Sequence, residues 1–367
     1  MNQDKLTIQS VRARPVNVPL ARPLQTSGGA VASAPLVLVD LTTAEGPTGR
    51  AYIFCYAPLA LAPIARLVEN LNDVLKGDAL VPLAIEDKLQ RTFRLLGYQG
   101  FASMALAGID MAAWDAVGQA SGQSLVRLLG GEPRPIPAYN SKGLGIVGAD
   151  RAGAEASELL AEGFRAVKVR LGYPDVATDV AVVRAVRQAV GEIAGEGAPV
   201  MSDYNQSLSV AEARQRLRHL DAEGLYWVEE PTRFDDYTGH ASIRAAAGTP
   251  IQLGENCWGP HDMAKALEAG ACDYFMIDVM KIGGITGWLR AAALAEACGI
   301  PVSSHLFPEV SAHLMAVTPT AHWLEYIDWA SPILQQPLEI ADSTATAPDR
   351  PGLGLAWDEA AVAKYLV

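Results

Sequence analysis

The sequence predicts an α/β fold, a TIM-type (β/α) barrel preceded by a separate α+β domain. From about residue 134, short apolar segments alternate with helical stretches, which is the pattern of repeated βα units. Before that point, a strand-rich segment is followed by a helix-rich one, as in an α+β domain. Most of the predicted barrel strands end in an ionisable side chain, at the edge where barrel enzymes carry their active sites.

The α+β domain is predicted to span residues 1–133. Apolar alternation over 6–18, a β-rich run over 36–41 and the turn EGPTG at 45–49 predict a three-stranded meander. The Ala-rich stretch 102–120 is apolar on most faces, which predicts a largely buried helix.

The barrel is predicted to span residues 134–335. Its eight strands are expected at 136–139, 166–170, 200–203, 225–229, 251–255, 274–278, 302–305 and 323–325. Helical patterns such as 210–222 and 285–298 lie between them, so the strands should be parallel and close into a barrel. Residues 336–367 contain the turn-rich PGLGL and a final short helix, and we expect this segment to pack back on the first domain.

Composition excludes several classes of partner. The net charge is −12, and no cluster of Lys and Arg is visible, which argues against nucleic acid. The first twenty residues lack the apolar core of a signal peptide, and the longest apolar stretch, around 57–68, is broken by prolines and an arginine. The four cysteines form no CxxC pair. We therefore expect a cytoplasmic protein that does not bind membranes.

Three carboxylates have the spacing of a metal site. Asp203, Glu229 and Glu255 are separated by 26 residues in each step, which is one βα unit, so they should lie at one height on successive strands. Oxygen ligands of this kind suit Mg²⁺, with Mn²⁺ as an alternative ion. Glu230 should point away from this site, because neighbouring residues of a strand face opposite sides.

Two basic residues lie two positions apart on the strand before Asp203. Lys168 and Arg170 therefore share a face and could bind a substrate carboxylate. A lysine crowded by a second cation and a metal can have its pKa lowered enough to act as a base, whereas arginine stays protonated.

Acid and base candidates end the later strands. Asp278 and His305 end neighbouring strands, and an aspartate that accepts from one ring nitrogen raises the basicity of the other. Glu325 could donate a hydrogen bond to an enolate oxygen if an apolar setting keeps it protonated. Together with the metal, these groups suit removal of a proton next to a carboxylate, so we expect a small-molecule carboxylate substrate.

Several distinctive segments span nearly the whole chain, namely GIDMAAWDA, GFRAVKVRLGYP, DYNQS, WVEEPT, VMKIGG, SSHLFPEVSAHL and TPTAHWLE. Together they resemble the mandelate racemase subgroup of the enolase superfamily. The resemblance implies a capping domain on a modified (β/α)₇β barrel, Mg²⁺ on the three carboxylates, and a homo-oligomer. It further implies acid/base catalysis by the His305–Asp278 dyad, Glu325 as electrophile, and Ser141 and Asn205 near the substrate or metal.

Three features concern the pocket that the resemblance implies. The segments 21–33 and 50–57 are expected to line it, and the apolar side chains there, including Tyr56, suit an aryl or alkyl group. Lys142 stands where the resemblance leads us to expect histidine, and could meet a second anionic group of the substrate. Arg170 replaces the second lysine of a Lys-x-Lys pair, which puts two-base racemisation in doubt.

Three hypotheses follow. The first is a racemase-like isomerase acting on an α-hydroxy or similar α-substituted carboxylate. The second is a sugar-acid dehydratase, a lyase that uses His305 as its single base. The third is a non-catalytic barrel that binds an anion.

Overall fold

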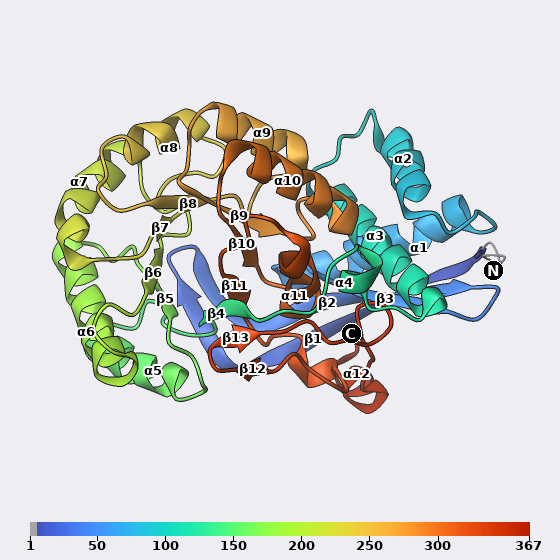
Figure 1. Cartoon of the computed structure of the whole chain (residues 1–367), viewed down its shortest axis with the longest axis horizontal. Coiled ribbons are helices and arrows are strands. Elements are labelled where there is room, and N and C mark those ends of the chain that lie inside the picture. Colours follow the sequence, from blue (N-terminus) through green and yellow to red (C-terminus); the bar gives the residue numbers. More distant parts are fainter. Residues whose placement is uncertain (1–5) are drawn as a thin grey trace.

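The chain folds into a capping domain and a barrel. The computed structural model describes residues 6–367, so residues 1–5 of the predicted capping domain lie outside the described part. Strands β1, β2 and β3 form an antiparallel meander, and the helices of this domain pack against it, as Figure 1 shows. The elements of this domain are β1 (Ile8–Thr26), β2 (Gly29–Thr43), β3 (Thr48–Phe54), η1 (Pro58–Ala60), α1 (Leu61–Leu75), α2 (Pro82–Phe93), α3 (Gly100–Ser121) and α4 (Leu125–Leu128).

The long helix α3 lies directly on the meander. Most of its residues are buried, as the Ala-rich sequence predicts, and small side chains allow a close approach. A Cβ atom at Gly49 of β3 would lie 1.8 Å from the carbonyl oxygen of Ala112, so glycine is required there.

The barrel contains the predicted parallel strands. They are β4 (Ile136–Asn140), β5 (Val167–Arg170), β6 (Val200–Asp203), β7 (Val228–Glu229), β8 (Ile251–Leu253), β9 (Tyr274–Asp278), β10 (Val302–His305) and β11 (Leu324–Tyr326). The helices between them are α5 (Ala149–Leu160), α6 (Val176–Ala194), α7 (Val210–Leu220), α8 (Tyr237–Arg244), α9 (Pro260–Glu268), α10 (Gly284–Cys298) and α11 (Pro308–Val317), with η2 (Asp221–Glu223) after α7. The barrel is closed on both sides of β11. Strand β11 pairs with β4, and residues His322 and Trp323, just before β11, exchange backbone hydrogen bonds with β10. The predicted α/β barrel with a capping domain is confirmed.

Two predicted strands are shorter than expected. The predicted strand 225–229 is reduced to Val228–Glu229, and the predicted strand 251–255 ends at Leu253. Gly254 has a φ of 130°, which turns the backbone out of the ladder. Glu255 therefore lies in the turn beyond β8 rather than on the strand.

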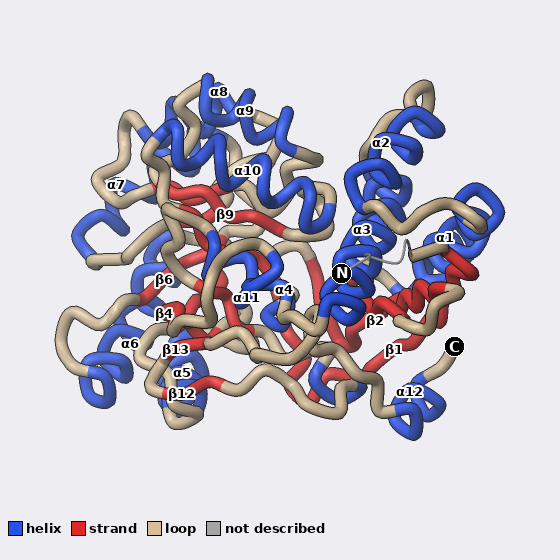
Figure 2. Tube along the Cα trace, turned by 45° about the vertical axis from the view of Figure 1, so that its right-hand side comes forward, coloured by secondary structure: helices blue, strands red, loops and turns tan. Residues whose placement is uncertain are grey.

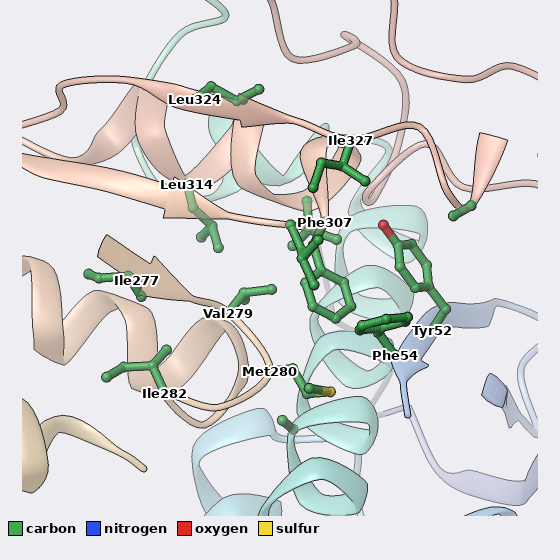
Figure 3. Close-up of a cluster of buried hydrophobic side chains, with 14 of the residues drawn as sticks. Tyr52, Phe54, Ile277, Val279, Met280, Ile282, Phe307, Leu314, Leu324 and Ile327 are labelled. Carbon is green, nitrogen blue, oxygen red and sulfur yellow. The ribbon is translucent and has the colours of Figure 1, made fainter. Parts of the chain in front are cut away.

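An apolar interface joins the capping domain to the barrel. Figure 3 shows Tyr52 and Phe54 of β3 close to Phe307, Ile327 and Met280 of the barrel. The rings of Tyr52 and Phe307 stack with their centroids 4.9 Å apart. Burial of these large rings stabilises the interface and fixes the position of the segment that follows β3.

The β1–β2 hairpin reaches from the capping domain to the barrel, as Figure 1 shows. The segment 21–33, expected to line the pocket, is the far end of this hairpin. Ser27 donates a hydrogen bond to the carbonyl oxygen of Tyr204, 2.8 Å away, and the backbone N–H of Ile146 donates to Gln25 over 2.7 Å.

The C-terminal segment contacts both parts of the molecule. It contains η3 (Ser331–Ile333), β12 (Ile340–Ala341), β13 (Thr344–Ala345) and α12 (Glu359–Tyr365). Strand β13 pairs with β4, while Trp357 donates to Asp40 of β2 over 2.7 Å. Figure 2 shows α12 beside β1 at the edge of the capping domain. Within residues 6–367, no helix combines the length and apolarity needed to cross a membrane.

Candidate active site

Three carboxylates meet at the C-terminal mouth of the barrel. Asp203 ends β6, Glu229 ends β7, and Glu255 follows β8. One oxygen atom from each lies within 4.8 Å of the others. Asp203 and Glu229 are buried, and the Glu255 side chain is 13% exposed. A compact set of oxygen donors with this charge fits a hard divalent cation such as Mg²⁺ or Mn²⁺.

Neighbouring polar groups orient these carboxylates. Asn205 donates to Asp203 over 2.8 Å, and the Trp227 indole donates to Glu229 over 3.2 Å. Asn205 Oδ1 has no hydrogen-bond partner among the described residues, and Asn205 also lines the pocket. It is therefore free to accept from a substrate hydroxyl or to approach the metal.

Lys168 lies among carboxylates rather than beside a second cation. Its Nζ is 3.0 Å from Glu229 Oε1, 2.8 Å from Glu325 Oε1 and 3.7 Å from Asp203 Oδ2. Burial opposes its charge, but Glu229 and Glu325 outweigh burial and hold the Lys168 pKa well above its ordinary value. In the free protein Lys168 is therefore a cation suited to binding a carboxylate, and the lowered pKa expected beside both Arg170 and a bound metal stays a prediction.

The surroundings of Glu325 favour its ionised form, whereas the sequence predicts a protonated carboxyl group. Its oxygens accept from Ser141 Oγ over 2.7 Å and from the backbone N–H of Leu306 over 2.9 Å. Burial raises its pKa, but Lys168, His305 and Arg170 outweigh burial and bring the Glu325 pKa to about 2. In the free protein, Lys168, Arg170 and a protonated His305 therefore favour the carboxylate over the predicted protonated donor.

The His305–Asp278 pair has the geometry of an acid/base dyad. His305 Nδ1 lies 2.7 Å from Asp278 Oδ2, and the backbone N–H groups of Met280 and Lys281 donate to Asp278 Oδ1. Although burial lowers the His305 pKa, Glu255 and Asp278 outweigh it and raise the pKa above its ordinary value. Nδ1 is held by Asp278, while Nε2 lies 3.2 Å from Glu255 Oε2 and faces the metal site, so Nε2 is the atom placed for proton transfer once a metal binds Glu255.

Arg170 is held by the backbone of the segment after β4. Its NH1 donates to the carbonyl oxygens of Ser141 and Gly143, each over 2.7 Å, and its NH2 donates to Ser141 Oγ over 2.8 Å. The side chain is buried, and Nε has no partner among the described residues. A guanidinium fixed by three acceptors is a hydrogen-bond donor and not a proton acceptor.

These groups share one cavity of about 260 Å³. Its charged and polar side contains Lys168, Arg170, Asp203, Asn205, Glu255, His305 and Glu325. Its apolar side contains Leu24 and Val31 from the hairpin, Phe54 and Tyr56 from the end of β3, and Leu306, Ile327 and Trp329 from the barrel. The predicted segments 21–33 and 50–57 therefore both contribute side chains to the pocket.

Ser141 and Lys142 do not line this cavity. Ser141 is fully buried between Arg170 and Glu325, so it positions these two side chains. Lys142 Nζ lies 2.6 Å from Glu162 and 2.9 Å from Asp328, on a separate cavity. The hypothesis that Lys142 meets an anionic substrate group needs correction, because both carboxylates already neutralise it.

A polar cluster that the sequence did not predict lies beside Glu255. Glu230 has a φ of 33°, so the chain leaves the strand and its carboxylate lies with Asn256 instead of pointing away. Asn256 donates to Glu230 over 2.7 Å and to Glu255 over 3.0 Å, and accepts from Lys281 over 2.5 Å. The positions of Asn256, next to a metal ligand, and of Lys281, three residues after Asp278, were the available signals.

The fold and the carboxylate set define a capped barrel with a divalent-metal site. Residues 8–130 match the N-terminal domain of mandelate racemase and muconate lactonizing enzyme, and residues 151–361 match the enolase C-terminal domain-like family. The chain belongs to the mandelate racemase/muconate lactonizing enzyme family of the enolase superfamily, whose members use Mg²⁺.

Relatives of this chain catalyse several reactions. A solved enolase from Bradyrhizobium, in complex with magnesium and mandelic acid, is 47% identical with a TM-score of 0.94, covering 100% of this chain and 99% of its own. The 3,6-anhydro-α-L-galactonate cycloisomerase of Streptomyces coelicolor is 32% identical over 96% of this chain and 97% of its own length. The L-talarate/galactarate dehydratase of Salmonella typhimurium is 31% identical over 80% of this chain and 71% of its own length.

Proposed function

We propose that this enzyme removes the α-proton of a 2-hydroxycarboxylate from one face, with His305 as the only base. The observation that carries the proposal is the fixed position of Arg170, which lines the same cavity as His305. We call its hydrogen bonds to Ser141 and Gly143 the Arg170 clamp. Racemisation by two bases needs a proton acceptor on each face of the α-carbon, and a guanidinium bound to two carbonyl oxygens does not supply one.

The residues have separate roles in this proposal. Mg²⁺ on Asp203, Glu229 and Glu255 supplies a Lewis acid for the enolate oxygens. Lys168 binds the substrate carboxylate, and Arg170, which lines the same cavity, adds positive charge beside it. Asp278 holds the His305 ring so that Nε2 takes the α-proton.

One-sided proton removal leads most directly to elimination. Where the substrate carries a β-hydroxyl, His305 can return the abstracted proton to that hydroxyl, which leaves as water as the Cβ–O bond breaks. The resulting enol then tautomerises to a 2-keto acid, so the geometry favours a dehydratase over the racemase-like isomerase. The apolar side of the pocket, with Phe54, Tyr56 and Trp329, favours a compact and partly apolar substituent over a polyol. The isomerase is the second candidate, favoured by similarity to the solved relative with bound mandelic acid.

Proton exchange in D₂O tests the proposal. With Mg²⁺, we expect deuterium at the α-carbon of only one enantiomer of a 2-hydroxy acid, and release of a 2-keto acid from 2,3-dihydroxy acids, detected with semicarbazide. Equal exchange of both enantiomers would favour the isomerase. Absence of exchange and of keto acid across a library of such acids would favour the anion-binding barrel.

The substitution Arg170→Lys tests the role of the clamp. A lysine lacks the planar fork of donors that spans the acceptors at Ser141 and Gly143, and its amine can lose a proton, so the variant should exchange the disfavoured enantiomer at least about tenfold faster than wild type. The measurement is NMR of each enantiomer in D₂O. Arg187→Lys, on α6 at the surface, is the matched control and should leave the enantiomer ratio unchanged. An unchanged ratio in Arg170→Lys would show that the clamp does not set the one-sided chemistry.

A further inference from the structure

We propose that Lys281 is a positioning residue that couples the metal ligand Glu255 to the capping-domain wall of the pocket. The inference rests on the proposed metal-dependent function and adds a residue that the sequence analysis did not assign. Lys281 is buried, with 4% of its surface exposed, and its Nζ contacts two different elements. One is Asn256, which follows Glu255, and the other is Tyr56, which follows β3 of the capping domain.

The first contact fixes the orientation of the Asn256 amide. Lys281 Nζ donates to Asn256 Oδ1 over 2.5 Å, so the amide nitrogen faces the carboxylates and donates to Glu255 Oε1 and Glu230 Oε2. The two ends of an amide are not interchangeable, because one only accepts and the other only donates. A cation on Oδ1 therefore determines which way Asn256 holds Glu255.

The second contact holds a strained residue of the pocket wall. Lys281 Nζ lies 4.3 Å from the centroid of the Tyr56 ring, within the range of a cation–π interaction. Tyr56 has a φ of 58°, a left-handed conformation that is unfavourable in a non-glycine residue and persists only where surrounding contacts impose it. Lys281 and Phe54, whose ring centroid lies 4.7 Å from that of Tyr56, supply such contacts.

The backbone of Lys281 is fixed independently of its side chain. Its N–H donates to Asp278 Oδ1 over 2.9 Å, in the turn that also holds the His305 partner. The ammonium group thus extends from a rigid turn, and its two contacts are made at once. A metal ion that fixes Glu255 will restrict Asn256, then Lys281, then Tyr56, and this coupling must act equally in both directions.

Hydrogen–deuterium exchange of residues 50–57, with and without Mg²⁺, tests the coupling in the full chain. In the wild type, Mg²⁺ should slow exchange in this segment. In Lys281→Met, which keeps the length of the side chain but removes its charge, most of that protection should disappear, while Mn²⁺ affinity measured by EPR falls by no more than about 100-fold. Lys281→Arg should retain the protection, and Lys265→Met, an exposed lysine of α9, should behave as wild type.

The outcomes separate this inference from the proposed function. If Mn²⁺ fails to bind the wild type, the metal site and the coupling both fail. If Mn²⁺ binds but residues 50–57 gain no protection, or gain as much in Lys281→Met as in wild type, only the coupling is overturned. If Lys281→Met loses Mn²⁺ binding altogether, Tyr56→Leu decides, because it breaks the far contact without touching the ligands. The coupling predicts retained Mn²⁺ binding and lost protection in that variant, and retained protection would overturn it.

Discussion

His305→Asn is expected to slow α-proton exchange by about 10²–10⁴-fold, the usual contribution of a positioned general base. Asparagine can still hydrogen bond to Asp278, so the end of β10 should keep its structure, but the amide cannot accept the α-proton. The measurement is the NMR rate of deuterium incorporation at the α-carbon, with saturating Mg²⁺ and the enantiomer that the wild type prefers.

The control for this prediction is His219→Asn, which changes an exposed histidine of α7 outside the site. It should exchange at the wild-type rate. Full exchange in His305→Asn would assign the base to another group, of which Lys168 is the first candidate because it lines the same cavity. Loss of Mn²⁺ binding in His305→Asn would instead indicate damage to the neighbouring ligand Glu255, whose Oε2 lies 3.2 Å from His305 Nε2.

The barrel and the convergence of its strand ends could be predicted because both follow from periodicity. Strands that repeat once per βα unit must end at one edge of a parallel sheet, so the regular spacing of Asp203, Glu229 and Glu255 translates directly into proximity. The His305–Asp278 contact follows in the same way, since these residues are paired neighbours on β10 and β9.

Charge states and long-range ion pairs could not be predicted from the same pattern. Lys142 is neutralised by Glu162 and Asp328, which come from parts of the chain that no periodicity connects to it. The carboxyl group of Glu325 follows an apolar pair of residues in sequence, yet cations from β5 and β10 surround it in space. Sequence spacing shows which strand a residue occupies, but the net charge around it depends on every strand that faces it.

The direction of the Glu230 side chain could not be predicted either, because its backbone leaves the strand conformation. Strand alternation placed its carboxylate on the far side, whereas the two-residue strand β7 ends before alternation applies. The positive φ of Glu230 brings its carboxylate to Asn256, beside the metal ligands. Short strands at a functional edge therefore weaken predictions that rest on side-chain alternation.

Removal of the metal is expected to abolish exchange completely, and Glu229→Gln is expected to prevent its recovery. Chelation with EDTA leaves no Lewis acid for the enolate, and added Mg²⁺ should restore the wild type. Glu229 is fully buried at the centre of the carboxylate set, so its neutral isostere should weaken Mn²⁺ binding by more than about 100-fold, the upper range for groups that merely support metal ligands.

Thermal unfolding gives a readout of this prediction that does not depend on turnover. An ion that binds only the folded chain stabilises it by about 2.7 kcal/mol at a concentration of 100 times its Kd, so Mg²⁺ should raise the wild-type Tm. Glu229→Gln should lose this shift, whereas Glu296→Gln, an exposed glutamate of α10, should keep it. A Glu229→Gln variant that retained the Mg²⁺ shift and the exchange rate would remove Glu229 from the metal site. Because its carboxylate contacts Lys168 at 3.0 Å, the metal-free variant also reports how far that ion pair stabilises the free protein.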